Sequence, residues 1–216
     1  MTMKKLVFLL FLVSAVLTSD AQYYRRSESS FLLGVNAGYT YPLGDFGKLA
    51  KNGIGGNISA KYLINDVIGI GFETGYHSFQ TKIPIDDRTV SQQYKCKIIP
   101  ALLETTFYIP TWDRSILPYA GLHFGAYIIN VNIKQKSDGY DGKDVSKSIY
   151  KFSPGIGPHI GVLFELSDKI NLDIKVRGDY VVKIEDSYEL DEYQEGNIGF
   201  NKMLNIGANI GLLYRF

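Results

Sequence analysis

The stretch "INLDIKVRGDYVVK", Ile170 to Lys183, decides the fold because two kinds of residue alternate along it. Apolar or small residues occupy the even positions, and amides and charges occupy most of the odd ones. A period of two is the signature of a β-strand, whose successive side chains point to opposite faces. The stretch therefore predicts a strand with one face suited to an apolar medium and one suited to polar partners.

The same alternation recurs along most of the chain, and no helical period of useful length competes with it. Glycine, aromatic and β-branched residues are frequent, as expected of an all-β chain with many turns. Eight segments alternate, at residues 31–40, 54–64, 67–79, 93–109, 118–133, 151–166, 170–184 and 200–216.

The links between these segments alternate in length. Those near 65–66, 110–117 and 167–169 are short, whereas those near 41–53, 80–92, 134–150 and 185–199 are long and polar. Up-and-down barrels of outer membranes have short periplasmic turns and longer extracellular loops. The segments also reach the ~9–11 residues that a tilted spanning strand needs. The pattern predicts an all-β, eight-stranded, antiparallel, up-and-down transmembrane β-barrel over residues 31–216.

A soluble β-sandwich with its apolar face inside is the alternative that alternation by itself leaves open. Aromatic residues favour the membrane interpretation, because rings prefer the membrane–water interface. The inferred periplasmic strand ends carry Phe31, Tyr62, Phe107, Trp112, Tyr119, Phe164, Tyr214 and Phe216.

The N-terminus carries a predicted export signal. Lys4 and Lys5 precede a short apolar core, and Ser19 and Ala21 supply the small residues of a cleavage site. The core is shorter than the ~20 residues of a spanning helix. We expect a signal peptide at 1–21, cleavage after Ala21, a short periplasmic leader at 22–30, and localisation in the cell outer membrane.

The composition argues against nucleic-acid binding and against a disulfide or paired-cysteine site. The chain has 216 residues with 23 basic and 22 acidic side chains, so a formal net charge of +1 offers no basic face for nucleic acid. Its single cysteine, Cys96, excludes an intrachain disulfide and a CxxC pair. We interpret Cys96 as a small residue of the barrel interior.

Polar residues on the predicted inner face form a candidate lumen network. Eight strands enclose a narrow interior that side chains fill, and opposite charges in such a space should pair. Counting across turns places Glu104 near His123 and Lys61 near Glu73. We predict a plug and no open channel, built from Lys61, Glu73, Glu104, His123, His159, Glu165, Asp173, Lys175, Arg177, Asp179 and Arg215.

No motif predicts catalysis, a metal site or a cofactor. The three histidines, His77, His123 and His159, lie on different predicted strands without ligand spacing. His77 and Ser78 are adjacent, so their side chains point to opposite faces and form no catalytic pair. The acidic run at 185–196 is interpreted as a solvated loop, with a divalent cation or a partner surface as its alternative.

Four stretches resemble the small outer-membrane β-barrel family of Gram-negative bacteria, often labelled porin-family, which includes barrels of the OmpX and OmpA type. They are "SDAQ" (19–22), "GVNAGYTYPLGDF" (34–46), "LPYAGLHFGAY" (117–127) and "NIGANIGLLYRF" (205–216). The resemblance covers the mature chain and implies outer-membrane lipid and the barrel-insertion machinery as partners. It implies no shared catalytic motif.

The last segment also resembles the recognition signal for outer-membrane insertion, through Ala208, Ile210, Leu212, Tyr214 and Phe216. We therefore expect a barrel with a structural or interaction role, acting through long extracellular loops toward a protein partner or within an envelope complex. A narrow porin-like channel for small solutes is the alternative. A lipid- or peptide-modifying enzyme is disfavoured, because no Ser/His/Asp cluster stands at the rim.

Overall fold

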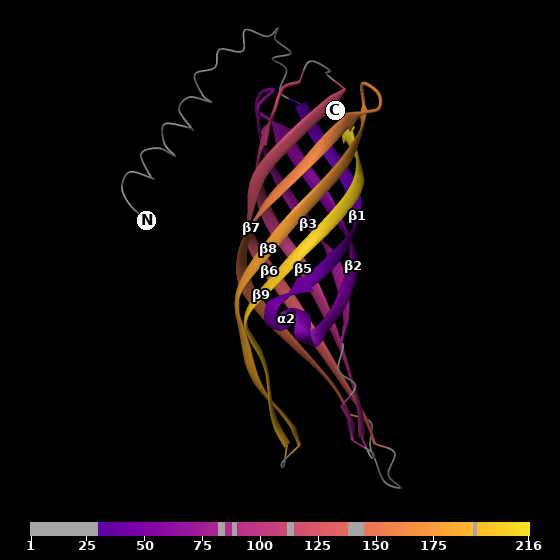
Figure 1. Cartoon of the computed structure of the whole chain (residues 1–216), viewed down its shortest axis with the longest axis vertical. Helices are drawn as coiled ribbons and strands as arrows, with labels where there is room; N and C mark the ends of the chain where they lie inside the picture. The colour runs from indigo at the N-terminus through magenta and orange to yellow at the C-terminus, as the bar shows by residue number, and fades with distance from the viewer. Residues whose placement is uncertain (1–29, 82–84, 88–89, 112–114, 138–144, 192–193) are drawn as a thin grey trace, which may run out of the picture.

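The computed structural model describes residues 30–81, 85–87, 90–111, 115–137, 145–191 and 194–216 (Figure 1). No helix in these ranges is long and apolar enough to cross a membrane. The elements in chain order are β1 (Ser30–Leu43), α2 (Gly44–Leu49), β2 (Ala50–Leu63), β3 (Ile68–Thr81), β4 (Ile85–Asp87), β5 (Val90–Tyr108), β6 (Ile116–Ser137), β7 (Val145–Glu165), β8 (Ile170–Asp191) and β9 (Gln194–Arg215).

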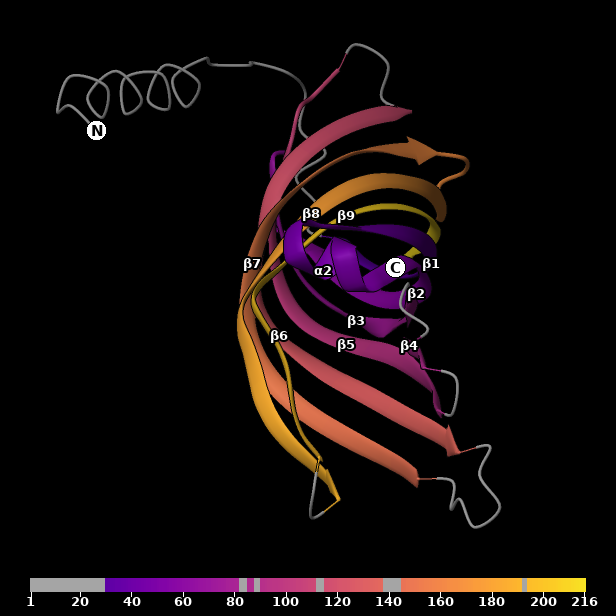
Figure 2. The same ribbon diagram turned by 60° about the horizontal axis from the view of Figure 1, so that its bottom comes forward.

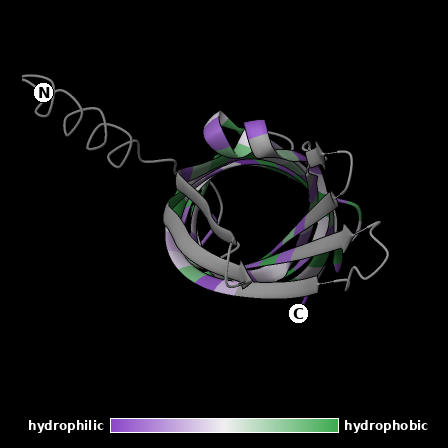
Figure 3. Cartoon of the chain, turned by 90° about the horizontal axis from the view of Figure 1, so that it is seen from below, coloured by the Kyte–Doolittle hydropathy of each residue, from purple (hydrophilic) through white to green (hydrophobic). Residues whose placement is uncertain are grey.

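The strands form one closed sheet. Their order is β3-β2-β1-β9-β8-β7-β6-β5-β4, and a further pairing of β3 with β5 closes the ring. All pairs are antiparallel, and the three-residue β4 only extends a hairpin beside β5. Seen along its axis, the chain is a ring (Figure 3). The predicted all-β, eight-stranded antiparallel barrel is confirmed, and the closed sheet excludes a two-sheet sandwich.

The two faces of each strand differ as the alternation predicts. On β8, Ile174 is 43% exposed on the outside, whereas its neighbour Lys175 is 1% exposed inside the barrel. Leu33, Ile58, Phe72, Leu103 and Ile210 are similarly exposed on other strands. Monomeric soluble proteins rarely expose large contiguous apolar patches, so an apolar belt that runs round the ring suits a hydrocarbon environment.

Aromatic side chains mark both edges of this belt. At the short-turn end, Phe31, Tyr62, Phe107, Tyr214 and Phe216 are exposed, and the Phe31 and Phe216 rings lie 5.9 Å apart. At the other end the exposed aromatics are Tyr39, Tyr41, Tyr76, Tyr150, Phe152 and Tyr180.

Two members of the predicted girdle need comment. Placing Tyr119 there was wrong, because its side chain is 3% exposed and points inside the barrel. Trp112 lies outside the described residues.

Much of the predicted long loops is regular structure. The loop predicted at 185–199 is mostly a continuation of β8 and β9, which pair as far as Asp191 and Gln194. β6 and β7 likewise pair to Gln135 and Val145. Antiparallel strands pair through backbone N–H and C=O groups, which every residue but proline carries, so polar segments can also form hairpins. The polar composition of these segments had predicted loops instead.

The loop predicted at 41–53 holds the short helix α2. It begins at Gly44, whose φ of +60° suits glycine because it lacks a Cβ. Phe46 is 1% exposed and packs edge-on against Phe79 of β3 at 5.3 Å between ring centroids. The helix therefore anchors the β1–β2 link at the barrel end from which the long hairpins extend, opposite the C-terminus (Figure 1).

Beyond the barrel body the sheet divides. Pairing between β7 and β8 ends at Gly155 and Val181, although both strands continue with their other neighbours. The β8–β9 hairpin and the β5–β6–β7 ribbon consequently extend in different directions (Figure 2).

Candidate functional site: the filled lumen

The lumen has three layers of side chains. Nearest the short turns is an apolar cluster of Leu32, Leu63, Tyr108, Tyr119, Leu163 and Leu213. Nearest the long hairpins is a second apolar cluster of Phe46, Ala50, Phe79, Cys96, Ile98, Leu102, Tyr127, Ile129, Val181 and Met203. Ion pairs occupy the space between, so a solute would meet apolar packing at each end and bound charges in the middle.

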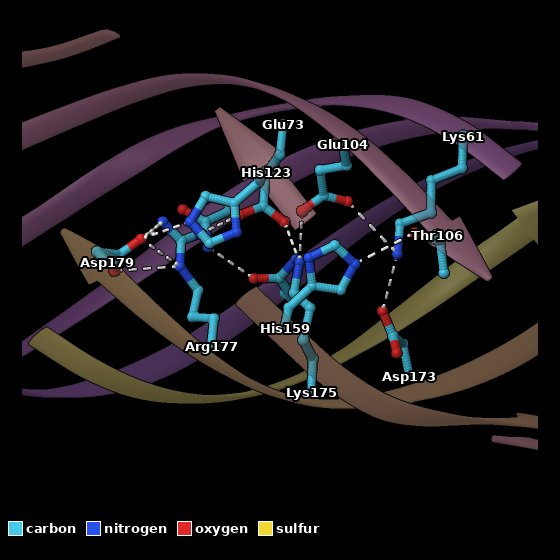
Figure 4. A network of polar contacts seen from close by, with 12 residues as sticks. Lys61, Glu73, Glu104, Thr106, His123, His159, Asp173, Lys175, Arg177 and Asp179 are labelled. Atoms are coloured by element: carbon cyan, nitrogen blue, oxygen red, sulfur yellow. Dashed lines mark hydrogen bonds and ion pairs between the residues drawn. The ribbon is translucent and has the colours of Figure 1, made fainter. Parts of the chain in front are cut away.

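The central layer is built around two cations of β8 (Figure 4). The Lys175 ammonium group donates to Glu73 of β3 and, at 3.0 Å, to Glu104 of β5. Arg177 donates to Glu73 through Nη1 and to Asp179 through Nη2 at 2.7 Å. Glu73, with 0% exposure, is shared by both cations and joins opposite walls of the barrel.

Lys61 of β2 completes the layer toward the short turns. Its Nζ lies 3.7 Å from Glu104 and 3.6 Å from Asp173, without a hydrogen bond. The same ammonium group lies over the Tyr119 ring, 5.2 Å from its centroid. The Tyr119 hydroxyl donates to Asp173 at 2.5 Å, so this carboxylate has both a cation and a hydrogen-bond donor.

The histidines are held by neutral and acidic neighbours. His123 Nε2 lies 3.0 Å from Asp179, which also accepts a hydrogen bond from the Tyr127 hydroxyl at 2.7 Å. His159 Nε2 lies 3.2 Å from Thr106 Oγ1, and its ring stacks on that of His123 at 5.8 Å.

His77 lies apart from the other two histidines. Its Nε2 is 2.8 Å from Asn57 Oδ1, and Asn57 donates to Asn36 at 3.0 Å. The three histidines are therefore packing and hydrogen-bonding residues, each on its own strand. In the described part of the chain, no group of three or more His, Cys, Asp or Glu residues could hold a metal ion.

Glycines make room for the large inner side chains. Tyr119 is paired across β6 and β7 with Gly161, where an added Cβ would lie 2.5 Å from the phenol oxygen. Gly121 is paired with His159, and a Cβ there would lie 2.5 Å from the imidazole Nε2. The alternation of very small and very large residues lets the narrow barrel close around its contents.

Burial dictates that these charges act as a unit. Lys61, Lys175, Arg177, Glu73, Glu104, Asp173 and Asp179 are each at most 5% exposed. An isolated buried ion is costly, and removing one partner of such a pair destabilises by about 3–5 kcal/mol. The network is thus a structural constraint on the barrel interior.

The remaining candidate residues lie at the rim. Arg215 donates to Glu165 at 2.9 Å, and their side chains are 19% and 21% exposed at the short-turn end. The structure thus brings nine of the eleven candidate residues into the buried layer and places these two at its edge. Tyr119 and Tyr127 are each an even number of positions from His123 on β6, so the alternation also predicts that they face inward. The network predicted from the sequence omitted both.

Of the two expected neighbour pairs, one is confirmed and one is wrong. Glu104 lies directly opposite His123. Lys61 lies opposite Gly71, while Glu73 lies opposite Ser59. The β2–β3 turn sets that register, and in this turn Asn65 Oδ1 accepts hydrogen bonds from the N–H groups of Val67 and Ile68. Because the sheet curves into a barrel, Lys61 lies close to Glu104 and Asp173 instead.

One small cavity lies among the inner side chains of the described residues. A cavity of about 10 Å³ lies among His77, Arg177, Asp179 and Asn205. That is room for about one water molecule.

Comparison with known proteins identifies the same architecture. Residues 7–216 match the sequence profile of the family described as "Outer membrane protein beta-barrel domain". No significantly similar sequence was found among curated proteins.

Solved structures give a matching result. Neisserial surface protein A aligns with TM-score 0.57 and 18% identity, covering 88% of this chain and 100% of that one. OprG of Pseudomonas aeruginosa aligns with TM-score 0.54 and 14% identity over 88% and 97% of the two chains. A major outer membrane protein of Thermus thermophilus aligns with TM-score 0.54 and 12% identity over 86% and 99%. At these identities the likeness shows the fold alone.

Proposed function

The chain belongs to the outer membrane protein beta-barrel domain family, and on this premise we propose that it is a closed barrel with a structural or interaction role. Its outer-membrane location follows from the family. We propose that the hairpins beyond the barrel body contact a protein partner, as a subunit of an envelope complex or as a surface-binding element.

The filled lumen carries this proposal. A conducting barrel needs a continuous polar path, whereas here the ion-pair layer lies between two apolar clusters. Glu73 and Lys175 are themselves buried and bonded across the interior, so neither presents a free charge to a passing solute.

The divided sheet supports an interaction role. In the described ranges, β7 and β8 make no backbone pairs with each other beyond Gly155 and Val181. Strand edges that lack a neighbour present rows of N–H and C=O groups, which an extended polypeptide can pair with. Among the residues that the structure describes, the barrel body has no such edge, because β3 and β5 close it.

The decisive experiment is conductance of the purified barrel in planar bilayers. We expect no steady open current, because the plug is bonded across the barrel. A steady current that Lys175→Gln or Asp173→Asn alters would overturn the proposal in favour of a narrow solute channel.

Mild extraction of outer membranes should co-purify a partner with the intact protein and not with a variant whose hairpin 185–199 is replaced by a short turn.

We further propose the export layout expected from the sequence: a signal peptide at 1–21, a short leader at 22–30 and the barrel from 31 to 216. Residues 1–29 lie outside the described ranges. Intact-mass measurement of protein extracted from outer membranes tests cleavage after Ala21. A mass that retains residues 1–21 would refute it.

The outer face of β9 is the proposed insertion signal for the barrel-assembly machinery. Ile210, Leu212, Tyr214 and Phe216 are 42–70% exposed, and Ala208 lies on the same face. The Phe216 N–H donates to the Phe31 carbonyl at 2.9 Å, which joins the end of the chain to β1. Deletion of Phe216 should reduce insertion in cells, and normal insertion of that variant would refute the signal.

A further inference from the structure

A shallow depression of about 840 Å³ interrupts the outer wall of the barrel. Its floor consists of small side chains on three neighbouring strands, with Ala37 of β1 paired to Gly56 of β2 and Ala208 lying on β9. Larger side chains border it, among them Tyr39, Ile54 and Tyr76, each at least 44% exposed. Elsewhere the belt carries mostly large apolar residues, so this is a place where a lipid chain can lie closer to the sheet.

Cations stand at one end of the depression. Ser78, which lines it, is paired with Lys97 of β5. The Lys97 ammonium group lies 6.0 Å from the centroid of the Tyr76 ring, and Lys95 is exposed two positions further along the same face. Within the described ranges, neither lysine forms a salt bridge.

We propose that this surface binds a phosphorylated lipid of the adjacent leaflet, with an acyl chain over Ala37 and Gly56 and the phosphate beside Lys97 and Lys95. The surface matches the two parts of such a lipid, because the apolar floor suits the acyl chain and the two lysines at its end suit the phosphate. The position fits as well: Tyr39 and Tyr76 belong to the aromatic edge on the long-hairpin side, where head groups begin. In the proposed orientation this is the outer leaflet.

A second copy of the chain suits the surface less well. A two-fold contact through the depression would bring the lysines of both copies together, which places like charges side by side. A phosphate, in contrast, supplies the opposite charge, and basic residues near a membrane surface attract anionic lipids.

The proposal is tested by native mass spectrometry of the full barrel released from detergent, with dioleoyl phosphatidylglycerol, dioleoylglycerol and inorganic phosphate as separate probes. Retention of phosphatidylglycerol above dioleoylglycerol is expected. Lys97→Glu should weaken it by about fivefold or more, which is the size expected for loss of a lysine at the surface. Lys169→Glu, the same change at the short-turn end, is the control and should have little effect.

A second variant tests the apolar floor. Ala37→Leu should fill the depression and weaken phosphatidylglycerol binding, whereas Ala120→Leu, outward-facing on β6, should not. Heat-modifiable gel migration confirms that each variant is folded. Equal effects of Lys97→Glu and Lys169→Glu, retention of phosphate without any lipid, or a dimer that displaces the lipid would each overturn the proposal.

Discussion

The first three strands and the last four differ in length. β1, β2 and β3 have 14 residues each, whereas β6 to β9 have 21 or 22. A tilted spanning strand needs only about 9–11 residues. Bilayer thickness accounts for the short strands, while the long ones continue well past the aromatic edge as hairpins.

The two regions are constrained differently. Inside the barrel body each position faces either lipid or a crowded lumen, so a change on either side meets a penalty. In the extensions there is no closed interior, and β7, β8 and β9 each pair with one neighbouring strand instead of two. The following substitutions compare the regions directly, beginning with the largest expected effect.

Glu73→Ala should be the most damaging. It leaves Lys175 and Arg177 without their shared carboxylate, and breaking such buried pairs lowers the free energy of unfolding by about 3–5 kcal/mol. Urea unfolding in vesicles, followed by gel migration, measures the loss. Glu189→Ala in the β8 extension is the matched control, and equal losses for both would contradict a special role for the barrel body.

Ile174→Lys tests the lipid-facing side of the same barrel body. A lysine near the bilayer midplane costs about 2–4 kcal/mol in transmembrane barrels, falling to about 0–1 near the interfaces. Ile198→Lys in the β9 extension should therefore be nearly silent in the same unfolding assay. An Ile174→Lys barrel as stable as the unaltered protein would argue against lipid at this position.

Tyr119→Phe tests the hydroxyl that donates to Asp173. Hydrogen bonds to charged groups contribute about 1.5–3 kcal/mol, so the unfolding free energy should fall by that amount. Tyr180→Phe, on the exposed outer face, serves as control because its hydroxyl lies outside the lumen. No difference between the two variants would mean that Asp173 depends on Lys61 alone.

Replacing residues 185–199 by a short turn should have the smallest effect on stability. The replaced residues lie beyond the barrel body, where β8 and β9 keep their pairing from Ile170 to Val182. We expect a change below about 0.5 kcal/mol, as for surface changes in general, measured by the same unfolding curve. A large loss would show that the extension supports the barrel.

The faces of the strands were predictable because each face is determined by residues that are close together in the sequence. Ile174 and Lys175 are adjacent in the sequence, and a pleated strand separates their side chains whatever its neighbours are. The same parity would have placed Tyr119 inside, had its aromatic ring not suggested the interface. Strand ends were less predictable, because polar residues suit a solvated hairpin as well as a loop.

By itself, the sequence determined the number of long strands, their alternation and the set of charges that turn inward, since a two-residue period needs no knowledge of the partner strand. Only the tertiary structure decided which charges meet. Glu73 and Lys175 are 102 residues apart and lie on strands that are not neighbours in the sheet, so their contact exists only across the closed interior. The separation of β7 from β8 is likewise a property of the assembled sheet, because each strand taken alone continues without interruption.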